Sequence, residues 1–434
     1  MTGLIVQTEK DLDLWVAEFI QNSKGFLNTV DTKVAKIIKD VRNRGDEAII
    51  ELSRKFDNID LKESNFYFTD AEITKAEMEV PRKEREALEL AFSRIKSYHE
   101  KQLPKDKFWK DELGVELGFR WSPLSSIGIY VPGGIASYPS SVLMNAVPAK
   151  VAGVKSITMV TPTPSGKINP LVLFAARMAG VDRIIRLGGA QAIAALAFGT
   201  KNINPVDKIV GPGNAYVAAA KRQVFGEVGI DAVTGPSEVL IIADKKNNPK
   251  WIAADLLAQA EHDENSRAIL ITNDLRLANQ VKFAVEEYLH ILKFPKVART
   301  SWERNGKIIL VPSLDKSIEI ANLVAAEHLQ ICTNEPEILA NKINNAGAIF
   351  LGETTPEVFG DYILGSNHVL PTNRTARFSS SLSVIDFMKR TSISKMSKNA
   401  LRPLGEAAEL LAKAETLEAH SLSARLRIEA DNDY

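Results

Sequence analysis

The chain has 434 residues, of which 45% are hydrophobic and 25% are charged, values typical of two or three soluble globular domains. Its 54 Lys and Arg residues balance 54 Asp and Glu residues, so it lacks the basic surface expected of a nucleic-acid-binding protein. The single cysteine, Cys332, excludes a disulfide framework and a thiolate-rich zinc site.

The chain also lacks the sequence features of export and membrane insertion. The first residues, MTGLIVQTEKDLDLW, reach acidic side chains before an apolar run develops, so we expect no signal peptide. The longest uncharged stretch, residues 121–149, is interrupted by prolines and glycines, whereas a membrane-spanning helix needs about 20 mostly apolar residues. We therefore expect a cytoplasmic enzyme or binding protein with neither a membrane nor a nucleic-acid partner.

The first hundred residues are predicted to be helical. Apolar residues recur every three to four positions in residues 32–56 and 85–102, with charged residues between them. Asp70 and Glu72 are typical of the first turn of a helix. We interpret this region as scaffold.

From about residue 127, short apolar runs alternate with stretches of helical periodicity such as residues 169–180 and 274–290. This alternation predicts an α/β fold in which helices cover both faces of parallel sheets. Nine such runs favour two incomplete Rossmann-like, doubly wound sheets over one. The runs are residues 127–131, 156–160, 183–187, 208–210, 239–243, 268–272, 307–311, 329–333 and 347–351.

The pattern also predicts how the chain is divided into domains. We expect an N-terminal helical arm at residues 1–25 and a helical C-terminal tail at residues 386–434. Residues 26–125 and 235–385 are expected to form a first α/β domain with the metal-binding and catalytic residues. Residues 126–234 are expected to form a second α/β domain on the cofactor side.

Glycines follow several of the predicted strands, in YVPGG, LGGAQ and VGPGN. Ligands of parallel sheets bind beyond the carboxyl ends of strands, so these turns are candidate binding sites. Gly211 and Gly213 fit a dinucleotide-binding turn, and Asp231 follows about twenty residues later, but Tyr216 replaces the third glycine. Spacing alone therefore favours a tight turn capped by Asn214, whose helix could still bind a phosphate through its free amides.

Four of the six histidines have polar or acidic neighbours, whereas His99 and His290 lie on polar helices and are expected at the surface. Gln259 and His262 share one face of a helix end, where they could ligate a divalent metal or belong to a hydrogen-bonded surface. Glu327 and His328 mark a junction between a helix and a strand. His328 titrates near neutral pH, as a general base must, although an incidental Glu–His pair is an equal alternative.

Two further pairs of residues complete the candidates. Asp361 and His368 lie in a polar, glycine-bearing loop after the last strand, and long loops of this kind are often functional. Glu415 and His420 are five residues apart in the tail, so they would have to reach a site from elsewhere or belong to a solvated helix. Oxygen and imidazole ligands without thiolates permit zinc, manganese or cobalt at an open, substrate-accessible site.

Together these motifs resemble the histidinol dehydrogenase family. The resemblance covers roughly residues 120–427 in family order, and the first hundred residues resemble the family only loosely. Asn373–Arg374 is a departure at a variable position. The matching segments are IYVPGGIASYPSSVLMNAVPAKVAGV, LGGAQAIAALAFGT, VDKIVGPGNAYVAAAKRQVFGEVGID, GPSEVLIIAD, LLAQAEHDENSRAILIT, AAEHLQI, GDYILGSNHVLPT, TARFSSSLSV and AETLEAHSLSARLR.

The resemblance implies oxidation of L-histidinol to L-histidine through L-histidinaldehyde, with two NAD and one water, in histidine biosynthesis. It implies one Zn²⁺ per subunit, which holds the substrate, and an intertwined homodimer whose tail supplies site residues to the partner subunit. The implied metal ligands, which also contact the substrate, are Gln259, His262, Asp361 and His420. Further substrate contacts map to Ser237, His328, His368 and Glu415, and the NAD contacts to Tyr130, Gln191 and Asn214.

In the expected mechanism, His328 takes the hydroxyl proton while hydride leaves for NAD, and Glu327 then activates water for the aldehyde step. Three alternatives stay open at this stage. The nearest is a paralogue that oxidises another primary alcohol, such as a sulfonated diol. The others are a metal-dependent hydrolase with Glu327 as its base and a non-catalytic protein that binds imidazoles or stores metal.

Overall fold

The computed structural model describes residues 4–6, 9–22, 30–133 and 138–432. Parts of the predicted arm at 1–25 and segment 134–137 of the YVPGG motif region lie outside these residues. The chain divides into two compact units, which are considered separately below. Unit 1 comprises Met1–Gln102 and Ser125–Phe387, and unit 2 comprises Leu103–Leu124 and Met388–Tyr434. The predicted domain limits remain a prediction.

A six-stranded parallel sheet forms one half of unit 1. Its strands follow the order β1-β11-β10-β9-β12-β13. The chain moves outward from β9 to β11 and then returns to the other side of β9, which makes the sheet doubly wound. The strands are β1 (Leu4–Val6), β9 (Glu238–Ala243), β10 (Arg267–Thr272), β11 (Lys307–Leu310), β12 (His328–Cys332) and β13 (Ala348–Leu351).

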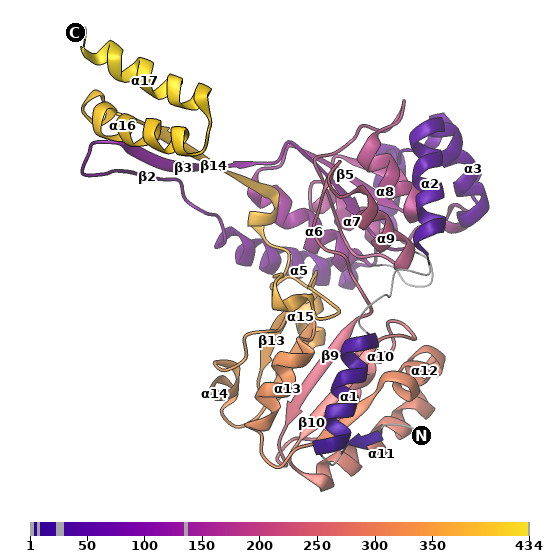
Figure 1. Cartoon of the computed structure of the whole chain (residues 1–434). Coiled ribbons are helices and arrows are strands. Elements are labelled where there is room, and N and C mark those ends of the chain that lie inside the picture. The colour runs from indigo at the N-terminus through magenta and orange to yellow at the C-terminus, as the bar shows by residue number, and fades with distance from the viewer. Residues whose placement is uncertain (1–3, 7–8, 23–29, 134–137, 433–434) are drawn as a thin grey trace. The chain divides into compact units, whose positions relative to one another are not determined.

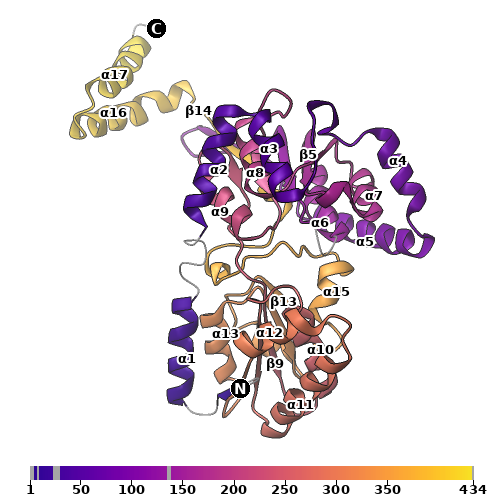
Figure 2. The ribbon, with the colours of Figure 1, turned by 90° about the vertical axis from the view of Figure 1, so that its right-hand side faces the viewer.

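Both faces of this sheet are covered by helices because successive residues of a strand point to opposite faces. Val239 and Ile241 pack with α10 (Pro249–Ala260), α11 (Leu275–Ile291) and α12 (Pro295–Asn305). Leu240 and Ile242 pack on the other face, against α1 (Glu9–Asn22), α13 (Lys316–Val324) and α14 (Pro336–Ala340). Figure 2 shows α1 and α13 on one side of β9 and α10 and α11 on the other.

A five-stranded parallel sheet forms the other half of unit 1, in the order β6-β5-β4-β7-β8. The chain again moves outward, from β4 to β6, and returns beside β4 with β7, so this sheet is wound in the same way. The strands are β4 (Ser126–Tyr130), β5 (Ser156–Thr161), β6 (Arg183–Arg186), β7 (Lys208–Val210) and β8 (Gly229–Ile230). The associated helices are α6 (Pro139–Ala152), α7 (Pro170–Met178), α8 (Gly189–Phe198) and α9 (Ala215–Val224).

The predicted helices of the first hundred residues pack on the helices of the five-stranded sheet. They are α2 (Asp31–Arg44), α3 (Asp46–Asp57), α4 (Asp70–Glu79) and α5 (Arg82–Glu100). α2 lies along α8 and α9 (Figure 1), α4 packs on α7, and α5 packs on α6. Thr69 and Glu72 form a reciprocal capping box at the start of α4, which confirms the predicted helix start.

The packing of α5 on α6 overturns the expectation that His99 is a surface residue. His99 is fully buried, its Nδ1 lies 2.7 Å from the carbonyl oxygen of Ile95, and its Nε2 lies 3.3 Å from the amide nitrogen of Asn367. The polar sequence of α5 hid this position because a helix needs only one narrow apolar face to pack. His290 is exposed on α11, as expected.

Unit 2 combines an antiparallel sheet with two helices. The sheet has the order β14-β3-β2, with strands at Met388–Lys395, Glu116–Pro123 and Lys107–Lys110 respectively. The helices α16 (Lys398–Ala414) and α17 (Glu418–Asn432) pack on each other. The helices confirm the predicted tail, but the three strands were not predicted, because β2 and β3 bury too few side chains to show an alternating pattern.

All nine predicted strands are present in two doubly wound parallel sheets, so the predicted fold class is confirmed. The sequence missed the short strands β1 and β8, which have three and two residues. No helix within the described ranges has the length and apolar character needed to cross a membrane.

Candidate active site

Glu327 and His328 lie where β12 begins, beside the first residues of β9. The pairing of His328 with Val239 brings both side chains to the backbone of Glu238. The Glu238 N–H donates to Glu327 Oε2 at 2.9 Å, and the Glu238 carbonyl oxygen lies 3.1 Å from His328 Nδ1. This cluster therefore lies at the amino ends of two strands. Glu327 and His328 thus lie at the predicted junction between a helix, α13, and a strand, β12.

The backbone contact fixes the protonation pattern of the His328 ring. A carbonyl oxygen only accepts hydrogen bonds, so Nδ1 carries a hydrogen and donates it. The other nitrogen, Nε2, is buried and makes no hydrogen bond to the described residues; Oδ1 of Asp361 lies 3.5 Å from it. When the ring is neutral, Nε2 is thus the nitrogen that can accept a proton.

Three carboxylates surround the His328 ring. Oε2 of Glu327 and Oε2 of Glu357 lie 3.8 and 3.7 Å from Nδ1, and Asp361 faces Nε2. Burial acts to lower the pKa of His328, but these negative charges outweigh it and raise the pKa to about 10. Burial also raises the pKa of Glu327 to about 7 and that of Glu357 well above its usual value. The imidazolium form of His328 is therefore favoured near neutral pH, contrary to the expectation that this residue titrates there.

Glu357 is a residue that sequence reasoning missed. It begins α15 (Glu357–Tyr362), is 2% exposed, and its Oε2 makes no hydrogen bond to the described residues. α15 also carries Asp361, which corrects the expectation that Asp361 lies in a loop. The spacing of four residues between the two acids could have signalled one helical face, but a helix this short gives little periodicity to detect.

The structure brings three of the four implied metal ligands to neighbouring elements. Gln259 is buried near the end of α10, His262 follows in the next turn, and α10 packs on α15, which carries Asp361. Burial lowers the pKa of His262, although much of its surface is solvent-exposed, and the charge of Asp361 opposes this effect. α10 ends at Ala260, so Gln259 lies in its last turn and His262 lies just beyond it, and a shared face of the two side chains stays a prediction.

The donor set suits a divalent cation such as zinc. One amide, one imidazole and one carboxylate supply oxygen and nitrogen donors, and the lowered pKa of Asp361 favours the carboxylate form that binds a cation. Within the described residues, no three His, Cys, Asp or Glu side chains are grouped to hold a metal by themselves. Gln259 belongs to none of these types, and the fourth implied ligand, His420, belongs to unit 2.

The remaining predicted substrate contacts fall in three places. Ser237 directly precedes β9, and its carbonyl oxygen accepts a hydrogen bond from the Arg267 N–H. His368 belongs to the polar loop after α15; its Nδ1 lies 3.0 Å from the Asp361 carbonyl oxygen and its Nε2 lies 3.4 Å from Ser141 Oγ. Glu415 and His420 are exposed residues of unit 2, and their role in the site stays a prediction.

The three residues implied as NAD contacts line a single cavity of about 710 Å³. Tyr130 ends β4 and Asn214 follows β7, so the cavity lies where the winding of the five-stranded sheet reverses. The Gly189 N–H donates to the Tyr130 hydroxyl at 3.1 Å, and burial raises the pKa of Tyr130 to about 12. The protonated hydroxyl can therefore donate its hydrogen to a ligand. Gln191 is 1% exposed.

The cavity also contains residues that the sequence assigned to scaffold. α2 and α3 contribute the side chains of Lys33, Lys36, Lys55, Phe56 and Asp57. Lysines and an aromatic ring suit an anionic ligand with a planar base. Helical periodicity alone gave no signal for this role, because it identifies the packed face of a helix and not the ligand that the exposed face meets.

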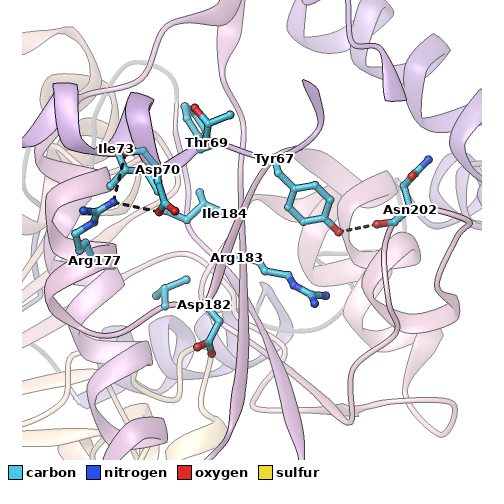
Figure 3. A pocket seen from close by; sticks show the side chains of 11 residues that line it. Tyr67, Thr69, Asp70, Ile73, Arg177, Asp182, Arg183, Ile184 and Asn202 are labelled. Carbon is cyan, nitrogen blue, oxygen red and sulfur yellow. Dashed lines mark hydrogen bonds and ion pairs between the residues drawn. The ribbon is translucent and has the colours of Figure 1, made fainter. Parts of the chain in front are cut away.

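A second hollow, of about 620 Å³, lies beside β6 (Figure 3). Arg177 in this hollow makes ion pairs with Asp70 and Glu77, and the Tyr67 hydroxyl donates to the Asn202 carbonyl oxygen at 2.6 Å. Arg183 projects between these groups. No predicted site residue lines this hollow, so it is separate from the cluster around His328.

Comparisons with known proteins agree with this geometry. The sequence model of the family described as histidinol dehydrogenase matches residues 21–428. Histidinol dehydrogenase of Ruegeria pomeroyi is 57% identical over 403 residues, 93% of this chain and 93% of that protein. The enzyme of Brucella suis biovar 1 is 55% identical over 428 residues, 99% of this chain and 100% of that protein.

A solved structure gives the same result. The crystal structure of histidinol dehydrogenase from Elizabethkingia anophelis matches with a TM-score of 0.92 at 36% identity, covering 100% of this chain and 99% of that chain. Sequence and structure thus agree over essentially the whole length. The chain belongs to the histidinol dehydrogenase family.

Proposed function

We propose that the protein oxidises L-histidinol to L-histidine through L-histidinaldehyde in histidine biosynthesis, reducing two NAD. The first step gives aldehyde, NADH and a proton; the second consumes one water and gives the acid, a second NADH and a proton. Relatives that are 55–57% identical to this chain are named histidinol dehydrogenase, which supports this substrate. The observation that carries the proposal is the buried His328 ring, whose Nε2 is the nitrogen left to accept a proton.

In the first step, Nε2 of His328 takes the hydroxyl proton of histidinol while hydride passes to NAD. The Glu238 carbonyl holds the hydrogen on Nδ1, so the ring keeps the tautomer that this step needs. The surrounding carboxylates stabilise the imidazolium that forms. Burial of the cluster excludes bulk water, which protects the reactive aldehyde from side reactions.

In the second step, Glu327 activates the water that adds to the aldehyde, and His328 then takes a proton from the hydrate. The pKa of Glu327, raised by burial to about 7, suits a carboxylate that accepts and releases a proton near neutral pH. The hydrogen bond from the Glu238 N–H leaves the second carboxylate oxygen of Glu327 for the water. Hydride passes to a second NAD.

Gln259, His262 and Asp361 would hold one zinc ion together with His420 from the tail. When bound, the zinc supplies a Lewis-acid anchor for the imidazole and amino nitrogens of the substrate. Ser237, His368 and Glu415 are proposed as further substrate contacts. Because the family's tail residues come from the partner subunit, this proposal includes a homodimer. A biosynthetic role fits the predicted cytoplasmic location.

NAD is proposed to bind in the cavity lined by Tyr130, Gln191 and Asn214. The Tyr130 hydroxyl and the Gln191 amide provide polar groups at the strand ends. The lysines of α2 and α3 offer positive charge to the phosphates. This arrangement differs from a three-glycine fingerprint and does not require one.

The alternatives considered from the sequence receive less support. A paralogue that acts on another primary alcohol is not favoured, because relatives that match 93–99% of the chain carry the name histidinol dehydrogenase. A hydrolase or a metal-storage protein would have no use for the cavity on the five-stranded sheet. A substrate panel separates these possibilities.

The decisive experiment measures NADH formation from L-histidinol with purified protein, before and after chelation and after zinc is restored. We expect two NADH per histidinol, lost on chelation and recovered with zinc. Absence of NADH from zinc-loaded protein would overturn the proposal. Product without NADH would indicate the hydrolase.

A further inference from the structure

A buried ion pair lies beside the glycine turn of the proposed NAD site. Lys221 of α9 and Asp231, just after β8, have side chains only 1% and 4% exposed, and Lys221 Nζ contacts Asp231 Oδ1. Few lysines are buried this deeply unless they are paired. The pair is remote from the cluster around His328 in sequence and belongs to the five-stranded sheet.

This pair holds both peptide groups of Gly211. Lys221 Nζ donates to the Gly211 carbonyl oxygen at 3.0 Å, and Asp231 Oδ2 accepts from the Gly211 N–H at 2.7 Å. Asp231 Oδ1 also accepts from the Ala232 N–H at 2.6 Å. All the polar atoms of the pair are therefore directed at the turn or at each other.

The Gly211 turn lies directly beside two residues that are proposed NAD contacts. Gly211 has φ +109°, and a Cβ there would lie 2.2 Å from the carbonyl oxygen of Tyr130, so the turn runs directly against the end of β4. Three residues later Asn214 caps α9 by accepting from the N–H groups of Tyr216 and Val217. Tyr130 and Asn214 both line the cavity.

The position of Asp231 contradicts the role that its spacing suggests. In a dinucleotide fingerprint, an acid about twenty residues after the glycines binds a ribose hydroxyl. Here the Asp231 side chain is buried and bonds to Lys221, Gly211 and Ala232. Asp231 is not among the residues that line the cavity. Its contacts show that it supports the Gly211 turn from behind the residues that line the cavity.

We propose that Lys221 and Asp231 are positioning residues for the dinucleotide: their ion pair sets the path of Gly211 and thereby holds Tyr130 and Asn214 in the arrangement that binds NAD. The inference rests on the proposed function, because it needs NAD in this cavity. A buried pair contributes little net stability but defines one geometry, since breaking it leaves an unpaired buried charge.

Three variants test the proposal. Lys221→Met keeps the aliphatic stem but removes the ammonium, and Asp231 retains two N–H donors. Asp231→Asn leaves a buried ammonium unpaired and risks unfolding. The double variant Lys221→Met/Asp231→Asn removes both charges and keeps an amide oxygen for the Gly211 N–H, so it tests the role of Lys221 in a folded background.

For the folded variants we expect the Kd for NAD, measured by calorimetry without histidinol, to rise by about tenfold or more, a loss typical of a misplaced binding group. The KM for NAD should rise in parallel. The KM for histidinol and the kcat at saturating NAD should stay within about twofold, because the cluster around His328 is unaltered. Circular dichroism and thermal melting identify the variants that fold.

Asp182→Asn is the matched control. Asp182 accepts from the Ile157 N–H at 2.8 Å and pairs with Lys150 at 3.3 Å, so its contacts resemble those of Asp231, but they hold β5 and not the Gly211 turn, and its side chain is 42% exposed. It should leave the Kd for NAD unchanged. An unaltered Kd in folded Lys221 variants, or equal rises in KM for NAD and histidinol, overturns the inference. Failure of the unmodified protein to bind NAD would instead overturn the proposed function.

Discussion

The His328 imidazole shows how burial and neighbouring charge compete at a single residue. Removing an imidazolium from water costs several kcal/mol, yet Glu327, Glu357 and Asp361 place three carboxylates around the ring. Their combined attraction outweighs the cost and raises the pKa of His328 to about 10. The ring acts as a base only once it is neutral, so any group that neutralises part of this negative charge favours the reactive form.

Substitution of the two proposed catalytic residues should affect the two oxidations differently. His328→Asn removes the base of both steps and should lower both rates by about 10²–10⁴-fold. Glu327→Gln removes only the activator of water, so it should spare oxidation of histidinol more than oxidation of histidinaldehyde. Single-turnover rates with each substrate measure this difference. Equal losses in both steps for Glu327→Gln would contradict the assigned roles.

Asp255 gives a prediction on stability that is independent of catalysis. Burial raises its pKa to about 6, with partial compensation from the Gln330 amide, which donates at 2.9 Å. The raised pKa means that this carboxyl favours folding fully below pH 3.8 and loses that contribution as the pH rises through 6. Asp255→Asn should therefore be more stable than the unmodified protein at pH 8, by about 1–3 kcal/mol.

The measurement for Asp255→Asn is denaturant unfolding at a series of pH values. The gain at pH 8 should shrink as the pH falls toward 4. Asp315→Asn serves as the control, because the Asp315 side chain is 76% exposed and its charge is already solvated. A gain that does not vary with pH would show that packing and not ionisation is responsible.

At the scale of whole elements, the two parallel sheets are wound alike, but their proposed sites lie at opposite ends of the strands. The five-stranded sheet places its cavity at the carboxyl ends of β4 and β7, where the winding reverses. The six-stranded sheet places Glu327 and His328 at the amino ends of β12 and β9. At that edge the peptide groups of Glu238 hold side chains, which suits a rigid catalytic cluster.

A glycine at the same edge tests this arrangement. A Cβ on Gly347, just before β13, would lie 2.5 Å from the Glu327 carbonyl oxygen. Gly347→Ala should displace the start of β12, cost about 1–3 kcal/mol of stability and lower kcat about tenfold or more, because catalysis is sensitive to small displacements. Gly229→Ala is the milder control, with its nearest contact, to the Asp207 carbonyl oxygen, at 3.2 Å. An unchanged kcat in the folded Gly347→Ala variant would show that the start of β12 is not rigid.

At the scale of the whole molecule, the proposed homodimer concerns unit 2. Glu415 follows α16, His420 lies on α17, and several leucines of these two helices are exposed. These are Leu410, Leu411, Leu422 and Leu426, which are 73%, 65%, 43% and 53% exposed. Exposed leucines gathered on paired helices are typical of a surface that becomes buried in an assembly, which supports the proposed homodimer.

Complementation between two inactive variants tests whether the tail serves the partner subunit. His328→Asn and His420→Gln should each be inactive as homodimers. Mixed dimers formed by co-expression would contain one site with both substitutions and one intact site. Random pairing should then restore roughly a quarter of the unmodified activity. No restoration, with mixed dimers shown by two affinity tags, would mean that each tail serves its own subunit.

The sequence by itself determined most of the elements and the family. Nine apolar runs became nine strands, the polar tail became two helices, and Asn214 caps its helix as the spacing predicts. These features are encoded locally, because strand alternation, helix capping and glycine turns depend on neighbours a few residues away. The proposed site residues come from family motifs, each of which is continuous in the sequence.

Only the tertiary structure decided which distant residues meet. It turned Glu357 toward His328, buried His99 against Asn367, and brought lysines of α2 and α3 to the cavity on the five-stranded sheet. It also joined Asp231 to Lys221 behind the glycine turn. Such contacts depend on strand order and helix packing, which bring together residues from ten to almost three hundred positions apart and leave no periodic trace in the sequence.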